Sequence, residues 1–356
     1  MKKIVILVSC ILVPLFSVMA QSSDITSSYV STAVPFLTIT PDSRAAGMGE
    51  VGVATKADVN SIHWNASKYA FINKKMGLSA SYTPWLKDVA EGINLACFSG
   101  YYKFANNQAV SASFRYFNLG DIDRLDNTGR ALGKTSPNEY ALDFAYSRKL
   151  SERFSMAVAF RYIQSNIIEG DNASSVAADV SCFYTKEFPN ANLAFGANIS
   201  NIGSKITYSN ADYYLPTNLK LGTSYTRSID DESKISLSLD VNKLLVKGGD
   251  KSGFIKNGVI SIGGASNDDV ISSMISSLSD FSAITYSIGT EYSYDEILFL
   301  RFGYFYESAN AGNRNYMTTG LGINYSSIDF DLAYLISTDS TNPLKNTIRF
   351  TIGYNF

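Results

Sequence analysis

The chain has 356 residues, of which 46% are hydrophobic, and its net charge is −2. Its lysines and arginines are scattered, which argues against a nucleic-acid partner, because phosphates demand a concentrated basic face. After the N-terminal stretch, no apolar run is long enough for a membrane-spanning helix, and the apolar residues, including 23 Tyr and 21 Phe, are spread in alternation.

Residues 1–20 have the pattern of a secretory signal peptide. Two lysines precede an apolar run over 4–13, and small residues at 18–20 offer a cleavage site before Gln21. An alternative interpretation takes Cys10 as a lipoprotein cleavage site, but the hydrophobic stretch before it is short and apolar sequence continues past it. We therefore expect an exported protein.

Residues 21–74 precede the first strand-like segment and form a predicted N-terminal segment. The stretch from Thr32 to Phe71 lacks long alternation but contains a run of small residues over 44–52. Such a segment is able to line or plug a barrel that is wide enough to have a lumen. His63 is the only histidine of the chain, and we interpret it as a structural residue rather than a general base.

Residues 75–356 contain 14 segments with a two-residue hydrophobic period. They lie near 75–84, 91–104, 108–118, 138–149, 153–166, 174–187, 191–201, 217–228, 233–245, 281–294, 297–307, 314–325, 327–337 and 346–356. Most are long enough for a tilted strand to cross the hydrocarbon core of a membrane. The number of segments is even, as in bacterial outer-membrane barrels. The predicted fold class is therefore all-β and transmembrane: a 14-stranded antiparallel outer-membrane β-barrel.

The connections alternate in length along the chain. Short turns are expected near 105–107, 150–152, 188–190, 229–232, 295–296 and Ser326, and longer loops near 85–90, 119–137, 167–173, 202–216, 246–280, 308–313 and 338–345. Outer-membrane barrels have short periplasmic turns and longer outer loops, so both barrel ends of the chain are expected on the periplasmic side. In the longest loop, residues 268–275 are expected to form a short helix with an acidic first turn.

The last strand shows the predicted division into two faces. Ile348, Phe350, Ile352, Tyr354 and Phe356 share one face, and Thr347, Arg349, Thr351, Gly353 and Asn355 share the other. Taken alone, this segment also fits a half-buried edge strand of a soluble β-sandwich. The number, length and connections of the other segments favour the membrane.

Four arginines on strand positions are expected to face the lumen: Arg115, Arg161, Arg301 and Arg349. A charge on the lipid face would cost about 2–4 kcal/mol near the midplane. We expect these arginines to pair with Asp143, Asp179 or the N-terminal segment, or else to tune selectivity. Cys97 and Cys182 lie inside predicted strands, where free thiols are expected rather than a disulfide.

Several stretches resemble the PorV family of the type IX secretion system, which is itself similar to FadL-type barrels. They include Pro41-Asp42-Ser43-Arg44-Ala45-Ala46-Gly47-Met48-Gly49, Tyr82-Thr83-Pro84-Trp85-Leu86 and Arg301-Phe302-Gly303-Tyr304-Phe305-Tyr306-Glu307, together with residues 35–39, 64–65, 119–122, 137–139, 146–150, 239–246, 291–294, 312–316 and 343–350. No single motif is specific, but their order spans nearly the whole mature chain. The sequence departs from the family pattern at Ala66-Ser67, at Lys247 and over 273–283.

The resemblance implies a FadL-like barrel with an N-terminal plug that acts without catalysis and without a cofactor or metal. Its partners would be outer-membrane lipid, the type IX translocon, the sortase complex and secreted cargo with a C-terminal sorting domain. The largest outer loops, near 119–137, 202–216 and 246–280, would present the cargo surface. Apolar loop residues are the expected contacts, or else they pack on one another and cap the barrel: Tyr213, Tyr214, Leu215, Phe254 and Ile255.

Two other functions remain open from the sequence. A FadL-like transporter of hydrophobic small molecules rests on the fold alone and should show an apolar pocket inside the barrel. An accessory protein or enzyme that modifies lipopolysaccharide lacks a catalytic group that we can name.

Overall fold

The computed structural model describes residues 32–86, 92–126, 128–168, 171–209, 211–246, 269–279, 284–308, 314–337 and 344–356. The predicted signal peptide over 1–20 lies outside these residues, as do Phe254 and Ile255.

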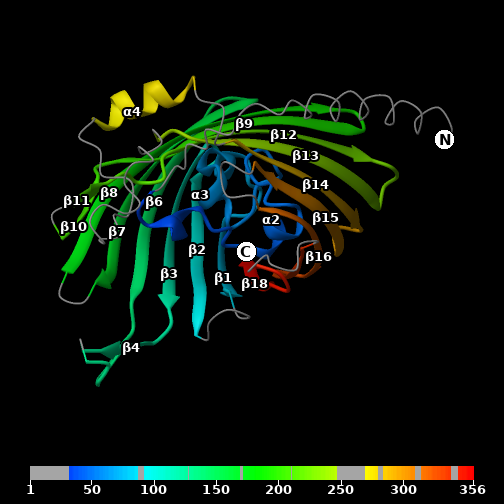
Figure 1. Ribbon diagram of the computed structural model, residues 1–356. Helices are drawn as coiled ribbons and strands as arrows, with labels where there is room; N and C mark the ends of the chain where they lie inside the picture. Colours follow the sequence, from blue (N-terminus) through cyan, green and yellow to red (C-terminus); the bar gives the residue numbers. More distant parts are fainter. Residues whose placement is uncertain are drawn as a thin grey trace, which may run out of the picture.

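Within the described residues, fourteen antiparallel strands close into a barrel, because the first strand pairs with the last (Figure 1). The strands are β1 (Met76–Pro84), β2 (Ile93–Ala105), β3 (Gln108–Leu119), β6 (Asn138–Ser151), β7 (Phe154–Ile168), β8 (Asp171–Phe188), β9 (Ala191–Gly203), β12 (Asn218–Ser228), β13 (Ser233–Leu244), β14 (Ile284–Tyr294), β15 (Leu298–Glu307), β16 (Asn315–Tyr325), β17 (Ile328–Ile336) and β18 (Ile348–Asn355). Each strand pairs with its neighbours along the chain. The predicted 14-stranded antiparallel barrel is confirmed.

The two faces of each strand differ in chemistry as the period of two requires. In β18, Arg349, Thr351 and Gly353 are buried inside the barrel, whereas Phe350, Ile352 and Tyr354 are exposed on its exterior. This division gives the barrel an apolar outer surface and a polar interior, as in outer-membrane barrels.

The two ends of the barrel differ in their connections. At one end, which we call the short-turn end, the strands are joined through residues 106–107, 152–153, 189–190, 229–232, 295–297 and 326–327. At the other, the long-loop end, the connections are 85–92, 120–137, 169–170, 204–217, 245–283, 308–314 and 337–347. One expectation was wrong: residues 167–173 are no long loop, because β7 and β8 continue toward each other until only 169–170 separate them.

Among the residues that the structure describes, three loops at the long-loop end contain secondary structure. The pair β4 (Ile122–Leu125) and β5 (Ala131–Thr135) forms one small hairpin, and β10 (Ile206–Tyr208) with β11 (Ala211–Tyr213) forms another. The helix α4 covers Val270–Ser277. It begins later than predicted, so that Asp269 occupies its N-cap position and the first turn is not acidic.

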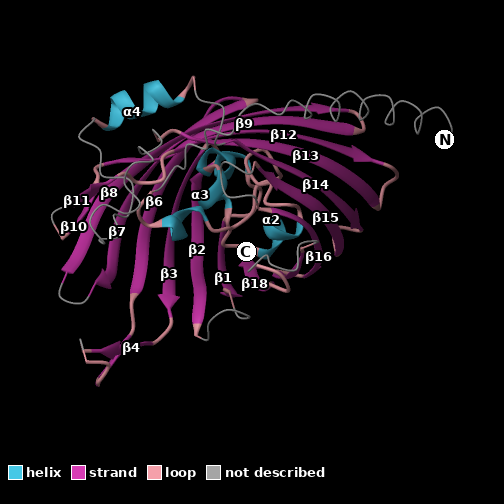
Figure 2. Cartoon of the chain, in the orientation of Figure 1, coloured by secondary structure: helices cyan, strands magenta, loops and turns pink. Residues whose placement is uncertain are grey.

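In its described part, from residue 32 on, the N-terminal segment contains four short helical elements: η1 (Pro35–Thr38), α2 (Ser43–Gly47), α3 (Ser61–Trp64) and η2 (Ala66–Phe71). Figure 2 shows α2 and α3 inside the ring of strands. The side chains of Asp42 and Asn65 cap α2 and η2 by accepting hydrogen bonds from the backbone N–H groups of Ala45 and Ser67. None of the described helices has the length and apolarity needed to cross a membrane.

Candidate functional site

The N-terminal segment fills the lumen and contacts the wall on all sides. Its polar groups are hydrogen-bonded to residues on many strands, and the following pairs involve seven of these strands. The pairs are Asn60 with Ser79 of β1, Ser67 with Ser155 of β7, Asn65 with Cys182 of β8, Trp64 with Asn198 of β9, Gly52 and Val53 with Asp240 of β13, Gly49 with Thr318 of β16, and Ser43 with Thr351 of β18. Such bonds satisfy backbone groups that a short irregular segment leaves unpaired.

The segment also approaches the wall closely where the strands carry glycine. A Cβ atom added to Gly303 of β15 would lie 2.0 Å from the backbone N of Gly49 and 2.1 Å from the carbonyl carbon of Met48. On the neighbouring strand β14, a Cβ atom on Gly289 would lie 2.3 Å from the carbonyl O of Met48. The backbone at 48–49 is therefore seated directly on the bare backbone of the wall, where any side chain would displace it.

Arg44 forms the main ionic link between the segment and the wall. Its guanidinium donates two hydrogen bonds of 3.0 Å to the carboxylate of Glu291 on β14 and one of 2.8 Å to Asp58. Arg301 on β15 also donates to Glu291, at 2.7 Å, and binds Asp331 on β17 at 2.5 Å. Burial alone would raise the pKa of Asp58, but Arg44 and Lys68 hold that pKa below its ordinary value. Arg44 and Arg301 thus form a network of ion pairs with the carboxylates of Asp58, Glu291 and Asp331.

Asp42 and Trp64 form a second link within the segment. One carboxylate oxygen of Asp42 accepts from the N–H of Ala45 at 2.9 Å and the other accepts from the indole Nε1 of Trp64 at 2.8 Å. Burial, together with the nearby charge of Asp58, raises the pKa of Asp42 to about 6. Both partners of this carboxylate are neutral, so its charge is costly to bury.

Lys68 is buried inside the lumen with neutral partners. Its ammonium donates to the carbonyl of Gly52 at 2.7 Å and to the hydroxyl of Thr55 at 3.2 Å. Burial lowers the pKa of Lys68 to about 8. The side chain therefore ties η2 to the backbone at residue 52.

The predicted pairing partners Asp143 and Asp179 lie beside two of the predicted arginines. Arg115 lies 3.2 Å from Asp143, and Arg161 lies between Asp143 and Asp179, with 3.0 Å to the latter. A bulge in the β8–β9 pairing turns Asn201 inward, where its N–H donates to Asp179 at 2.8 Å. All of these side chains are buried inside the barrel.

His63 takes part in this arginine network as an acceptor. Its Nδ1 lies 3.1 Å from a terminal nitrogen of Arg115, and a guanidinium only donates, so Nδ1 carries no proton. Burial and the charges of Lys220 and Arg115 lower the pKa of His63 well below its ordinary value. The ring is therefore neutral and points into a hydrogen-bonded network. Arg349, the last predicted arginine, is buried 3.5 Å from Glu50 of the N-terminal segment.

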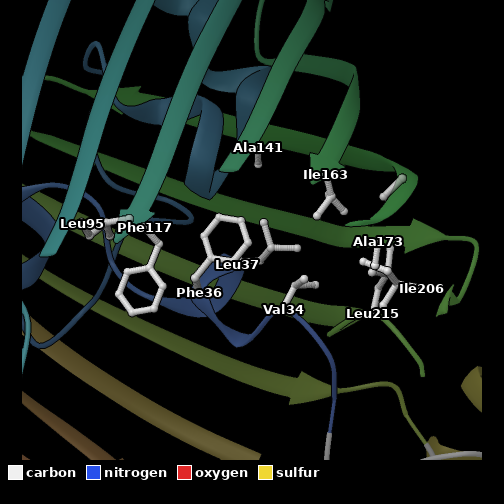
Figure 3. Packing of buried hydrophobic residues seen from close by; sticks show 11 residues of the cluster. Val34, Phe36, Leu37, Leu95, Phe117, Ala141, Ile163, Ala173, Ile206 and Leu215 are labelled. Atoms are coloured by element: carbon white, nitrogen blue, oxygen red, sulfur yellow. The ribbon is translucent and has the colours of Figure 1, made fainter. Parts of the chain in front are cut away.

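The long-loop end of the lumen is closed by an apolar cluster (Figure 3). The rings of Phe36 and Phe117 are parallel, with centroids 6.2 Å apart. The cluster combines the start of the N-terminal segment, the adjoining ends of β2, β3, β6, β7 and β8, and the β9–β12 loop: Val34, Phe36, Leu37, Leu95, Phe117, Ala141, Ile163, Ala173, Ala177, Ile206 and Leu215. The chain's own side chains thus occupy this apolar end.

Three of the predicted partner contacts belong to this closure. Tyr214 and Leu215 are buried, and Tyr213 is half-buried against the cluster. The N–H of Ala33 donates to the carbonyl of Tyr214 at 3.0 Å. Their positions match the alternative in which these residues cap the barrel, and their role as partner contacts stays a prediction.

Trp85 connects two apolar clusters at this end, a role that the sequence did not predict. It packs against the cluster of Figure 3 and against a second one formed by Phe305, Tyr316, Leu335 and Leu344. The guanidinium of Arg349 lies over its ring, 5.7 Å from the centroid.

A small cavity of about 60 Å³ lies beside Arg44, between the N-terminal segment and the wall near the short-turn end. Its lining is mainly polar and includes Lys56, Lys234, Glu291 and Glu296. The volume admits a few water molecules. It is neither large nor apolar enough for a hydrophobic small molecule.

The sequence did not predict the ionic network, whose members include Arg44, Asp58, Glu291 and Asp331. Two of them carried a usable signal, because Glu291 and Asp331 occupy inward positions of alternating strands. Glu291 pairs directly across the β14–β15 ladder with Arg301. The positions of Arg44 and Asp58 in an irregular segment give no comparable signal.

Comparison with known proteins places these features among outer-membrane barrels. The family model "Type IX secretion system protein PorV" matches residues 22–251. No curated protein matches the chain significantly.

Solved structures with the same fold include a toluene transporter, a monoaromatic hydrocarbon channel and a FadL homologue. The toluene transporter TodX of Pseudomonas putida is 11% identical, with a TM-score of 0.54 over 87% of this chain and 96% of that chain. The CymD monoaromatic hydrocarbon channel is 12% identical, with a TM-score of 0.55 over 91% and 98%. A Pseudomonas aeruginosa FadL homologue is 11% identical, with a TM-score of 0.51 over 89% and 99%. At this identity the likeness concerns the fold alone.

Proposed function

Because the chain belongs to the PorV family of type IX secretion system proteins, we propose that it is a non-enzymatic outer-membrane component of this secretion pathway. In this role it binds cargo with a C-terminal sorting domain at the translocon and carries it to the sortase complex for attachment at the cell surface. The barrel itself anchors the protein in outer-membrane lipid.

The observation that carries this proposal is the filled lumen. The N-terminal segment is bonded to strands all around the wall, and the apolar cluster of Figure 3 closes the long-loop end. A protein whose interior is occupied by its own buried side chains acts through its outer surface. The surface at the long-loop end is the one that faces out of the cell.

Exposed apolar residues on outer loops offer contacts for such a partner. Ile122 and Leu132 are exposed on the β4–β5 hairpin, and Ile271 and Ile275 are exposed on α4. Apolar anchors of this kind carry much of the binding energy of protein interfaces. Phe254 and Ile255, in the same connection as α4 by sequence, are proposed as further contacts for the partner.

A second candidate function is transport of a hydrophobic small molecule. The fold of toluene transporters and the apolar cluster at the long-loop end favour it. For this function the side chains of Phe36, Leu37 and Phe117 would have to move apart, because they occupy the apolar space themselves. The filled lumen therefore favours the secretion role.

The test is gentle purification of the protein from its native outer membrane, followed by mass spectrometry of what is recovered with it. An unrelated outer-membrane barrel serves as the control. We expect secreted proteins that share a C-terminal sorting domain, together with translocon or sortase components. Recovery of fatty or aromatic compounds without a protein partner would contradict the secretion role and support transport.

A matched pair of variants locates the partner surface. Leu132→Ser changes a side chain that is 54% exposed at the long-loop end, and Ile229→Ser changes one that is 60% exposed at the short-turn end. We expect Leu132→Ser to lower the yield of cargo relative to the unchanged protein and Ile229→Ser to leave it unchanged. Equal yields for both variants would remove the β4–β5 hairpin from the proposed surface.

A further inference from the structure

At the short-turn end of the barrel, basic and acidic residues lie on different halves of the rim. Within the described residues, the half formed by the ends and turns of β1, β2, β3, β6, β7 and β8 is mainly basic, and we call its basic residues the basic rim: Lys74, Lys75, Lys103, Arg148, Lys149, Arg153 and Lys186, against Glu152 and Glu187. The half formed by β12 to β17 is mainly acidic: Asp230, Asp231, Glu232, Asp295, Glu296 and Asp329, against Arg227 and Lys234. The short-turn end therefore has a basic side and an acidic side.

The basic rim is continuous from strand to strand. The backbone N–H of Lys103 donates to the carbonyl of Lys75 at 2.8 Å, which joins the ends of β1 and β2. The N–H of Lys149 on β6 donates to the carbonyl of Asn107, in the β2–β3 turn, at 2.8 Å. The carbonyl of Arg153, in the β6–β7 turn, accepts a hydrogen bond of 2.9 Å from the backbone of β8. The positive charges thus follow one another around this half of the barrel.

Two members of the basic rim hold the N-terminal segment. The ammonium of Lys103 donates to the carbonyl of Ile72 at 2.7 Å. The ammonium of Lys149 lies over the ring of Phe71, 4.6 Å from its centroid. These contacts are to neutral groups, so both charges remain without a counter-ion.

The other five side chains of the basic rim form no hydrogen bond or ion pair within the part of the chain that the structure describes. Two of them lie over aromatic rings of the barrel exterior. The ammonium of Lys186 is 4.9 Å from the ring centroid of Phe188, and that of Lys75 is 6.0 Å from the ring centroid of Tyr102. On the acidic half, by contrast, Lys234 is paired with Glu296. The charge of the basic rim is therefore left for a partner outside the chain.

Exposed aromatic residues place the basic rim at the membrane surface. Phe104 and Tyr146 are 48% and 42% exposed on the barrel exterior, and their rings stack with centroids 6.5 Å apart. Tyr102 and Phe188 are exposed beside them. Exterior aromatic rings at the end of a barrel mark the boundary between hydrocarbon and water. Arg148 follows Tyr146 on the same face of β6 and is exposed, so its guanidinium lies at the depth of the lipid headgroups.

We infer that the basic rim binds anionic phospholipid headgroups in the inner leaflet of the outer membrane. The short-turn end faces the periplasm, so the headgroups beside it belong to that leaflet. The acidic half repels the same headgroups, so anionic lipid gathers on one side of the barrel. An acidic periplasmic protein would also be attracted to these charges, but the exterior aromatic rings beside Arg148 and Lys186 favour lipid. The inference does not rest on the proposed secretion role, because it concerns the wall of the barrel.

The test measures the phospholipids that the purified full barrel retains in an uncharged detergent. Phosphatidylglycerol or phosphatidylcholine of the same chain length is titrated in, and native mass spectrometry counts the bound lipids. The double variant Arg148→Gln, Lys186→Gln removes two charges of the basic rim. The matched control, Arg130→Gln with Lys134→Gln, removes two exposed charges of the β4–β5 hairpin at the long-loop end. A third protein, Arg148→Lys with Lys186→Arg, keeps both charges and separates charge from packing.

We expect the unchanged protein to retain phosphatidylglycerol in preference to phosphatidylcholine. The Arg148→Gln, Lys186→Gln variant should bind phosphatidylglycerol at least about fivefold more weakly, because each cation beside an anionic lipid contributes about this factor. The hairpin control and the charge-keeping variant should bind it like the unchanged protein.

Three outcomes would overturn the inference. Equal retention of the two lipids would mean that charge does not select them, and an acidic periplasmic protein would then be the partner of the basic rim. Equal binding by the two glutamine variants would mean that the lipid binds without regard to the rim. An equal loss in the charge-keeping variant and the Arg148→Gln, Lys186→Gln variant would mean that packing, and not charge, is responsible.

Discussion

Removing the Arg44 guanidinium should release the N-terminal segment from the wall. Arg44→Met keeps much of the side-chain volume but leaves the carboxylates of Asp58 and Glu291 without this partner. Breaking a buried ion pair from one side costs about 3–5 kcal/mol. We expect a loss near 3 kcal/mol, because Arg301 still pairs with Glu291 and the side chain of Asp58 is partly exposed.

The same segment supplies a matched control. Lys56 lies 3.8 Å from Glu296, but the two side chains are 72% and 56% exposed, so Lys56→Met should cost less than about 1 kcal/mol. The chain has two tryptophans, and Trp85→Phe leaves Trp64 as the reporter of the segment. Urea titration of the detergent-solubilised barrel, followed by Trp64 fluorescence, measures release of the segment.

For a slope of about 1–3 kcal/mol per M urea, Arg44→Met should lower the midpoint by roughly 1–3 M. Lys56→Met should shift it by clearly less. Equal midpoints for the two variants would refute the view that the buried network, rather than the apolar contacts alone, holds the segment in the lumen.

Three further predictions concern the same segment and use the same fluorescence assay. Burial holds the pKa of Asp42 at about 6, above the 3.8 of the unfolded chain, so between these two values the folded state binds a proton that the unfolded state does not. The free energy needed to release the segment should therefore fall as the pH rises from about 4 to about 6. The difference between these two pKa values corresponds to a loss of at most about 3 kcal/mol in the free energy of release. Asp42→Asn should flatten the pH dependence of this free energy. An unchanged pH dependence in the variant would show that another group is responsible. Gly303→Ala should prevent the segment from packing on the wall, because its Cβ would lie 2.0 Å from a backbone atom of the segment. Gly353→Ala should be tolerated, because its Cβ would meet the Asp329 side chain at 3.4 Å and the carbonyl O of Leu78 at 3.8 Å, which are ordinary contacts. Equal behaviour of the two variants would argue against the close approach. Phe36→Ala should cost about 3–5 kcal/mol through loss of a fully buried ring, and a change below about 1 kcal/mol would mean that the apolar cluster does not hold the segment.

The strands of the barrel could be predicted because their chemistry repeats every two residues. In β18, for example, polar and apolar residues alternate without interruption, which sets both the strand and its faces. The β10–β11 hairpin was not predicted because its strands, Ile206–Tyr208 and Ala211–Tyr213, are too short for a period to show. The prediction of a loop over 167–173 was wrong because polar residues there resemble turn sequence, whereas the pairing of β7 with β8 continues to Ile168 and Asp171.

The interior arrangement depends on contacts that no local pattern encodes. Arg44 and Glu291 are 247 residues apart, and the segment around Arg44 has no hydrophobic period that would orient its side chain. Tyr214 and Leu215 were expected to be exposed or to cap the barrel, and a loop sequence does not distinguish these outcomes. Leu215 is buried against a cluster that contains Val34 and Phe36, and the carbonyl of Tyr214 accepts from the N–H of Ala33, so their placement depends on residues that the loop sequence does not contain.

The position of the N-terminal segment inside a closed ring of strands also constrains how the protein is assembled. The ring is completed by the pairing of β1 with β18, which are at opposite ends of the barrel sequence. Passing a free chain end through a ring already lined with bonded side chains is unfavourable, so this seam should close last, around a segment that is already in place.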